Sequence, residues 1–286
     1  MKEAENIVEI KGKLSEVNLR AGEKEGKHYI SGNIVVKINQ EISGKEVSMD
    51  LPVYMFASEK TKKGDENPAY KSALAVMNEM QSIAACKNVD KADSVSITKG
   101  QLEENPFMSQ QGKLILDTRI RASFVNKLTT PYEPLATFTT VIIIGSITPE
   151  LKDGEETGRL IISGILPQYG EKVDVIPFIV ESKAAIKHIE AHWQKGETVR
   201  VFGKINYSTK TITTEESVGF GDPIKKTRTE TTRELIVTSG SETGFPDESA
   251  YVAQEVSAAL IERKARLAEL ENGSTAKKNN KNILGF

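Results

Sequence analysis

Basic and aromatic side chains are interleaved along a polar stretch in the second half of the chain, residues 206–233. Lysine and arginine can neutralise phosphates, and aromatic rings can stack on bases. These two interactions hold single-stranded nucleic acids with little dependence on base sequence. Several of the basic residues follow closely on a glycine-rich turn, Gly219–Gly221. The candidate binding residues here are Tyr207, Lys210, Phe220, Lys225, Lys226, Arg228 and Arg233.

A second set of candidates lies in the first half of the chain. Arg119 and Arg121 flank Ile120, so on an extended strand the two arginines share one face. The other members fall in polar segments that we expect to be loops between strands. The set comprises Arg20, Lys24, Lys27, Tyr29, Phe107, Lys113, Arg119 and Arg121. A lysine-rich loop can equally be a solvated surface, so these residues form a site only if the fold brings them together.

The remaining aromatic residues are harder to assign from sequence. Tyr54, Phe56 and Phe178 lie on expected strands, where either a core position or a stacking platform is possible. We expect Phe124 and Phe202 in the core. Aromatic residues in loops are the better candidates for stacking, because a loop offers little core to bury them.

No pattern of residues indicates catalysis. His188 and His192 are one helical turn apart, but no third ligand accompanies them, and the sequence His-Ile-Glu-Ala-His is not the H-E-x-x-H zinc motif. Phosphate-binding loops, dinucleotide fingerprints, nucleophile elbows and cysteine pairs are all missing from the sequence. We therefore expect no enzyme activity, no cofactor and no metal.

Composition is that of a soluble globular protein of 286 residues, with 38% hydrophobic and 27% charged residues. The net charge of −2 argues against nucleic-acid binding, although a local basic groove can still attract a polyanion. The N-terminal residues lack the apolar core of a secretion signal. The single cysteine, Cys86, fits a reducing compartment, so we expect a cytoplasmic location.

An internal repeat organises the chain. Val8–Ser15 and Val141–Thr148 share the pattern V-x-I-x-G-x-(L/I)-(S/T), and Ile30-Ser31-Gly32 recurs as Ile162-Ser163-Gly164. Each half continues with a proline-containing strand, a helix and further alternating strands. Three strands, a helix and two strands make the plan of a five-stranded OB barrel. The expected fold is therefore mainly β, with two OB-type barrels in tandem, a C-terminal helix and a flexible tail.

The expected domain boundaries follow from this plan. The first barrel spans residues 1–128, a linker 129–136, the second barrel 137–243, a helix 244–272 and a basic tail 273–286. Asn67 and Pro68 are expected to begin the helix of the first barrel, and apolar residues at helical spacing extend it to Ile83. Ser182 is expected to cap the helix of the second.

The tandem V-x-I-x-G pattern, the helix positions and a tail ending in Phe286 resemble single-stranded DNA-binding proteins of bacteriophage replication systems, particularly those with repeated OB domains. The resemblance implies sequence-tolerant binding of single-stranded DNA in replication or recombination. In such proteins the tail before the terminal aromatic residue is often acidic, whereas here it is basic. Its apolar end, Ile283, Leu284 and Phe286, is the expected docking element for a replication or recombination protein or for another copy of the chain.

A structural or assembly protein built of tandem β-barrels is the alternative. The segment 206–229 separates the two hypotheses, because a DNA-binding protein predicts phosphate contacts there and an assembly protein predicts subunit contacts. RNA in place of DNA also remains open from the sequence.

Overall fold

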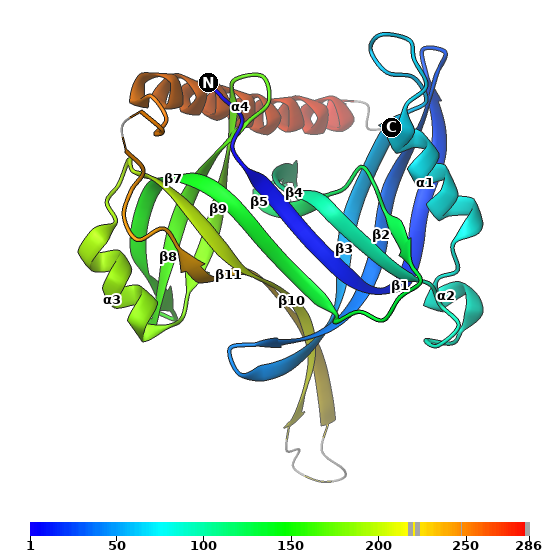
Figure 1. The fold of residues 1–286 in the computed structure, drawn as a ribbon, viewed down its shortest axis with the longest axis horizontal. Coiled ribbons are helices and arrows are strands. Elements are labelled where there is room, and N and C mark those ends of the chain that lie inside the picture. Colours follow the sequence, from blue (N-terminus) through cyan, green and yellow to red (C-terminus); the bar gives the residue numbers. More distant parts are fainter. Residues whose placement is uncertain (217–219, 221–223, 247, 284–286) are drawn as a thin grey trace.

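The first half of the chain folds into a ring of hydrogen-bonded strands (Figure 1). The computed structural model describes residues 1–216, 220, 224–246 and 248–283. Neighbouring strands pair in the order β1-β2-β3-β5-β4, and β4 pairs again with β1, which closes the ring. β3 and β5 run parallel, and the other pairs run antiparallel. The strands are β1 (Asn6–Lys24), β2 (Lys27–Ile42), β3 (Lys45–Ser58), β4 (Ser94–Met108) and β5 (Leu114–Arg121), and β6 (Asn126–Leu128) adds to β4.

The second half repeats this arrangement. Its strands pair in the order β7-β8-β9-β11-β10, and β10 returns to β7, with β9 and β11 parallel. They are β7 (Leu135–Lys152), β8 (Glu155–Gln168), β9 (Lys172–Val180), β10 (Thr198–Glu216) and β11 (Ile224–Gly240). In both halves a helical segment separates the third strand from the fourth, as the sequence predicted.

Alternation of side chains along the strands fills the two ring interiors. On β3 the buried residues are Met49, Leu51, Val53, Met55 and Ala57, so the residues between them face outward. Glycine at position 12 allows β1 to approach β2 closely, because a Cβ there would lie only 2.4 Å from the carbonyl oxygen of Lys37. A glycine at this point fits the role of bending the first strand of a small barrel.

The two rings are joined edge to edge. β1 pairs antiparallel with β7, from Asn6 opposite Thr140 to Lys11 opposite Leu135. The buried side chain of Gln40 on β2 reinforces the join. Its amide nitrogen donates to the carbonyl oxygen of Ile205 at 2.9 Å, and its oxygen accepts from the backbone N–H of Ala136 at 2.8 Å. Strands of both rings therefore form one continuous sheet.

The helices between strands begin where the sequence predicted. Asn67 caps α1 (Pro68–Glu79), and Ser182 caps α3 (Lys183–His192). The first helix was expected to run to Ile83, and this expectation is wrong. The backbone of Met80 is extended, and Ser82 caps a separate short helix, α2 (Ile83–Cys86).

A long helix, α4 (Ala253–Ile283), lies across β9 and β4 at one end of the molecule (Figure 1). It begins later than residue 244 and continues past residue 272, where the sequence predicted a tail. Val256 and Ala259 bury their side chains against Ile165 and Val173 of the second ring. None of the helices in the described part of the chain is long and apolar enough to cross a membrane.

Candidate nucleic-acid interface

Three aromatic side chains lie on the outer face of β2 and β3 in the first ring. Tyr54 and Phe56 point outward because Val53, Met55 and Ala57 take the inward positions of β3. The rings of Tyr29 and Phe56 stack with centroids 5.8 Å apart. The Tyr29 ring lies directly over Gly22 of β1, where any Cβ would come within 2.6 Å of it. Glycine at position 22 therefore makes room for the ring.

Basic residues border this aromatic surface. Lys24 and Lys27, at the turn between β1 and β2, line a hollow of about 500 Å³ together with Tyr29, Tyr54 and Phe56. Strand pairing also places Arg20 opposite Ser31, and Ser31 opposite Phe56. Arg20 therefore lies in the same cross-strand row as Phe56. The hollow thus combines aromatic faces with cations at its rim.

A second cavity, a groove of about 520 Å³, is lined by residues of both rings. Tyr54 lines both the hollow and the groove, and the two together are called the path below. Arg119 of β5 lies over the Tyr54 ring at 4.2 Å, and Arg233 of β11 lies over the Tyr207 ring at 5.0 Å. Both walls of the groove thus carry an arginine stacked on a tyrosine, an arrangement in which each cation meets the negative ring face.

The two groove arginines are also paired with carboxylates. Arg119 binds Glu103 of β4 at 3.0 Å, and Arg233 binds both oxygens of Asp117 on β5 at 3.0 and 2.9 Å. The Arg233–Asp117 pair crosses the groove, because its members belong to different rings. Acidic partners from the first ring therefore neutralise both groove arginines.

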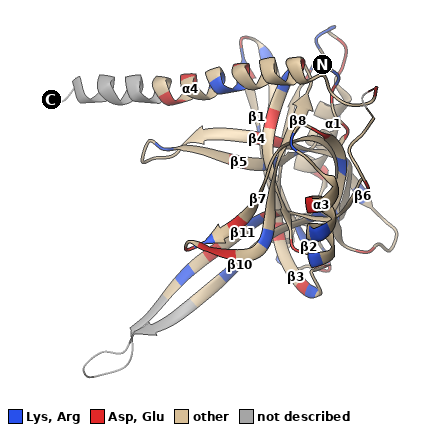
Figure 2. Cartoon of the chain, turned by 90° about the vertical axis from the view of Figure 1, so that its left-hand side faces the viewer, with Lys and Arg blue, Asp and Glu red and all other residues tan. Residues whose placement is uncertain are grey.

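The polar stretch 206–229 forms most of a β-ribbon and not an irregular loop. β10 and β11 continue beyond the second ring as a paired arm, from Asn206 opposite Glu234 to Glu216 opposite Ile224 (Figure 1). Figure 2 shows the arm and the β4–β5 hairpin projecting from the same side of the rings. Phe220 between the two strands is 95% exposed.

The arm's cations are distributed over its length and not gathered on one face. Register pairs Tyr207 with Arg233 and Thr209 with Thr231 on one side, whereas Lys210 pairs with Glu230 on the other. Arg228 forms an ion pair of 2.7 Å with Glu230. Lys225 and Lys226 lie on β11, and their side chains fall outside the described residues.

The fold brings together many of the residues predicted from sequence. Those on the path or beside it are Arg20, Lys24, Lys27, Tyr29, Arg119, Arg121, Tyr207 and Arg233. Phe107 and Lys113 lie near the end of the β4–β5 hairpin and do not line the groove. Of the apolar C-terminal residues, Ile283 ends α4, and Leu284 and Phe286 lie outside the described residues.

Five aromatic residues need separate comment. Tyr54 and Phe56 belong to the path, although the sequence left them undecided; the alternation of Leu51, Val53, Met55 and Ala57 was the signal that could have placed them outside. Phe178 is fully buried in the core. Phe124 and Phe202 were expected in the core, and this is wrong, since they are 47% and 38% exposed. Phe202 takes an outward position on β10 between the buried Val201 and Gly203, and Phe124 lies in the connection between β5 and β6.

The corresponding face of the second ring differs. Its outward residues include Ile165, Val173 and Val175, which are aliphatic, and α4 covers them. α4 is held there by Arg263, whose guanidinium binds the buried Glu104 of β4. Next to this pair, burial raises the pKa of Asp174 to about 6, and the charges of Glu104 and Glu103 add to the effect. The aromatic path therefore belongs to the first ring and the groove.

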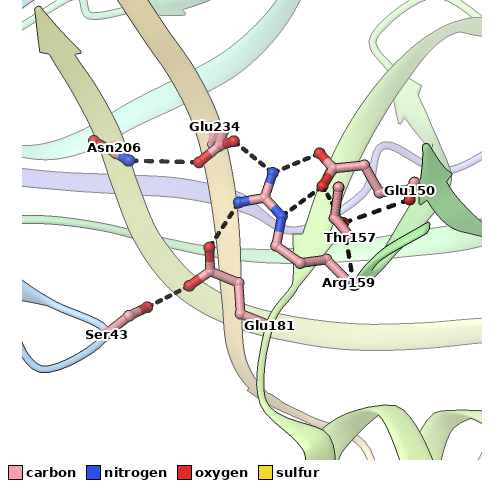
Figure 3. Close-up of polar contacts among 7 residues, drawn as sticks. All are labelled: Ser43, Glu150, Thr157, Arg159, Glu181, Asn206 and Glu234. Atoms are coloured by element: carbon pink, nitrogen blue, oxygen red, sulfur yellow. Dashed lines mark hydrogen bonds and ion pairs between the residues drawn. The ribbon is translucent and has the colours of Figure 1, made fainter. Parts of the chain in front are cut away.

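A network around Arg159 of β8 fixes the base of the arm (Figure 3). Its guanidinium donates from Nε to Glu150 of β7, from Nη1 to Glu181 after β9 and from Nη2 to Glu234 of β11, with a nitrogen–oxygen distance of 2.7 Å in each case. Glu181 also accepts a hydrogen bond from Ser43 in the β2–β3 turn of the first ring. Hydrogen bonding to Arg159 lowers the pKa of Glu150, despite its partial burial. Within the described residues, no group of three or more histidine, cysteine or acidic side chains is arranged to hold a metal.

Comparison with known proteins gives the following relationships. A model of the YorF family matches residues 4–273. No curated protein sequence matches the chain. A deletion mutant of the single-stranded DNA-binding protein from Thermus aquaticus is similar in structure, with a TM-score of 0.53, 12% identity, and coverage of 87% of this chain and 100% of that chain. The wild-type protein from the same organism gives a TM-score of 0.52 at 12% identity, with coverage of 87% of this chain and 98% of that chain. At this identity the likeness shows a shared OB-type fold.

Proposed function

This chain belongs to the YorF family, and from the path described above we propose that it binds single-stranded DNA with little dependence on base sequence. Bases stack on the aromatic rings, and phosphates bind the neighbouring lysines and arginines. One observation carries the proposal. Tyr29, Phe56, Tyr54 and Tyr207 line a hollow and a groove that share Tyr54, with Lys24, Lys27, Arg119 and Arg233 beside them.

The form of the path favours single strands over duplex. A base can lie on Phe56 or Tyr54 only if it is unstacked from its neighbours, which a duplex does not allow. The outer face of the second and third strands is also the surface on which OB barrels bind oligonucleotides. The likeness in fold to the DNA-binding protein of Thermus aquaticus supports the same reading.

Fluorescence anisotropy with labelled oligonucleotides tests the proposal. We expect tight binding of oligo(dT) and of mixed single strands, weak binding of a duplex of equal length, and affinity that falls with salt. For single strands the logarithm of the association constant should drop by about 0.7 per logarithmic unit of salt for each phosphate neutralised. Equal affinity for duplex, or no binding at low salt, would contradict the proposal. An RNA oligonucleotide in the same series reports whether DNA is preferred.

The biological setting we propose is DNA replication or recombination, of the bacteriophage type, in the cytoplasm. The protein coats single strands and carries out no chemical reaction. Its two barrels, residues 1–128 and 137–243, act with α4 as one binding body. The apolar residues Ile283, Leu284 and Phe286 recruit a replication or recombination protein or a second copy. Deleting residues 275–286 should then abolish recruitment and leave oligonucleotide affinity unchanged; a loss of affinity with a shallower salt slope would instead assign the tail lysines to DNA.

A further inference from the structure

We infer that Asp117 takes the place of a DNA phosphate on Arg233. The two residues together close the groove until a DNA strand displaces Asp117. The inference rests on the proposed function. Asp117 belongs to the first ring and Arg233 to the second, so their contact joins the two walls. Both residues line the groove through which the path continues.

The geometry of the pair is that of a guanidinium holding an anion. One terminal nitrogen of Arg233 donates to both Asp117 oxygens, at 3.0 and 2.9 Å. The N–H donors of arginine bind phosphate oxygens as they bind carboxylate oxygens. A phosphate entering the groove therefore competes with Asp117 for the same donors.

The pair also restricts access to a stacking surface. Arg233 lies over the Tyr207 ring at 5.0 Å, so the arginine held by Asp117 covers one face of that ring. On the opposite wall, Arg119 covers Tyr54 and is held by Glu103. An incoming nucleotide that draws Arg233 to its phosphate opens both a cation and a ring face.

Exposure of the pair makes the exchange feasible. The side chain of Arg233 is 49% exposed and that of Asp117 is 24% exposed. Pairs with this degree of exposure are weak and are screened by salt. Asp117 should therefore reduce DNA affinity modestly at low salt and progressively less as salt rises.

A double-mutant cycle on oligo(dT) binding tests the inference. We expect Asp117→Asn to tighten binding by about two- to fivefold at low salt, the range of a weak exposed ion pair, and to steepen the salt dependence. Arg233→Gln should weaken binding. In the Arg233→Gln background, Asp117→Asn should have no further effect, because the carboxylate then has no cation to occupy.

Asp50→Asn is the matched control, since it removes a carboxylate from the same ring that is paired with Lys37 and does not line the groove. Its effect should be smaller than that of Asp117→Asn. Unchanged affinity of Asp117→Asn, or equal tightening with and without Arg233, overturns the inference while leaving the proposed function standing. Failure of the parent and all variants to bind any single strand at low salt overturns the proposed function, and the inference with it.

Discussion

The rings of Tyr29 and Phe56 stack at 5.8 Å between centroids, with their planes inclined by 30°. The two residues come from neighbouring strands, and Phe56 remains 41% exposed. Each ring thus steadies the other without burying it. A base stacking on Phe56 meets a platform that is already ordered, so little conformational entropy is lost on binding.

We predict that Phe56→Ala weakens oligo(dT) binding by about 1–3 kcal/mol, the usual range for one stacked base, and leaves the salt slope unchanged because no cation is removed. Anisotropy titrations at two salt concentrations measure both quantities. Tyr169→Ala is the control, since Tyr169 is 77% exposed in the β8–β9 turn and lies off the path. Parent-like binding by Phe56→Ala would remove the first ring's outer face from the interface.

For the arm we predict that replacing Lys225, Lys226 and Arg228 with alanine weakens binding equally on all base sequences. The salt slope should flatten by at most about 2, since each lost phosphate contact contributes about 0.7. Replacing Lys183, Lys187 and Lys195 near α3 removes the same charge elsewhere and should have little effect. If the arm variant binds DNA normally but changes the sedimentation coefficient, the arm makes subunit contacts.

The aromatic path also marks what the sequence could and could not reveal. The order of strands and helices in each half and the helix caps at Asn67 and Ser182 follow from local patterns, and the structure confirms them. The groove does not follow from local patterns, because it exists only where β1 pairs with β7 and sets the two rings side by side. Nothing in the sequence near Asp117 indicates a partner at position 233.

The arm shows a second limit. Its polar composition is typical of a loop, yet the backbone continues two strands beyond the barrel, with threonines in cross-strand pairs such as Thr209 with Thr231. Threonine is β-branched and suits an exposed strand. The polarity therefore reported solvent exposure and not the absence of regular structure.

Asp174 should make folding stability depend on pH. Its pKa in the folded protein, about 6, is above the unfolded value of about 3.9, so the native state binds its proton more tightly. The stabilisation is complete below the unfolded pKa and is lost as pH rises through about 6. Asp174→Asn stays neutral at every pH. Its free energy of unfolding relative to that of the parent should therefore rise by up to about 3 kcal/mol between pH 4 and pH 7.5.

Urea unfolding of both proteins at pH 4 and 7.5 measures this difference. Asp93→Asn provides a control of opposite sign. Burial alone would raise the pKa of Asp93, but hydrogen bonds from Lys127 and from the backbone of Gln81 outweigh it and lower the pKa. Asp93→Asn should therefore lose stability at pH 7.5 and approach the parent as pH falls. The same pH response in parent and Asp174→Asn would contradict the assignment to Asp174.

Arg159 should be required to hold the base of the β10–β11 arm in a fixed position. Arg159→Gln leaves Glu150, Glu181 and Glu234 without their shared cation, which should cost about 1–3 kcal/mol of unfolding free energy or more. Amide hydrogen exchange should rise at the base of β11 and in the β2–β3 turn around Ser43, which the network connects. Lys152→Gln, a nearby exposed change, is the control. Unaltered exchange at both places would show that backbone pairing alone fixes the arm.

The pairing of β1 with β7 also sets the order in which the molecule can be completed at the ribosome. β1 is synthesised well before β7, yet its residues Asn6–Lys11 gain these partners only once residues 135–140 have been made. During that interval the nascent first ring presents an open row of N–H and C=O groups, the kind of edge on which chains aggregate. Synthesis of the second half closes that edge from within the same chain, so the protein carries its own protection against pairing with its neighbours on the polysome.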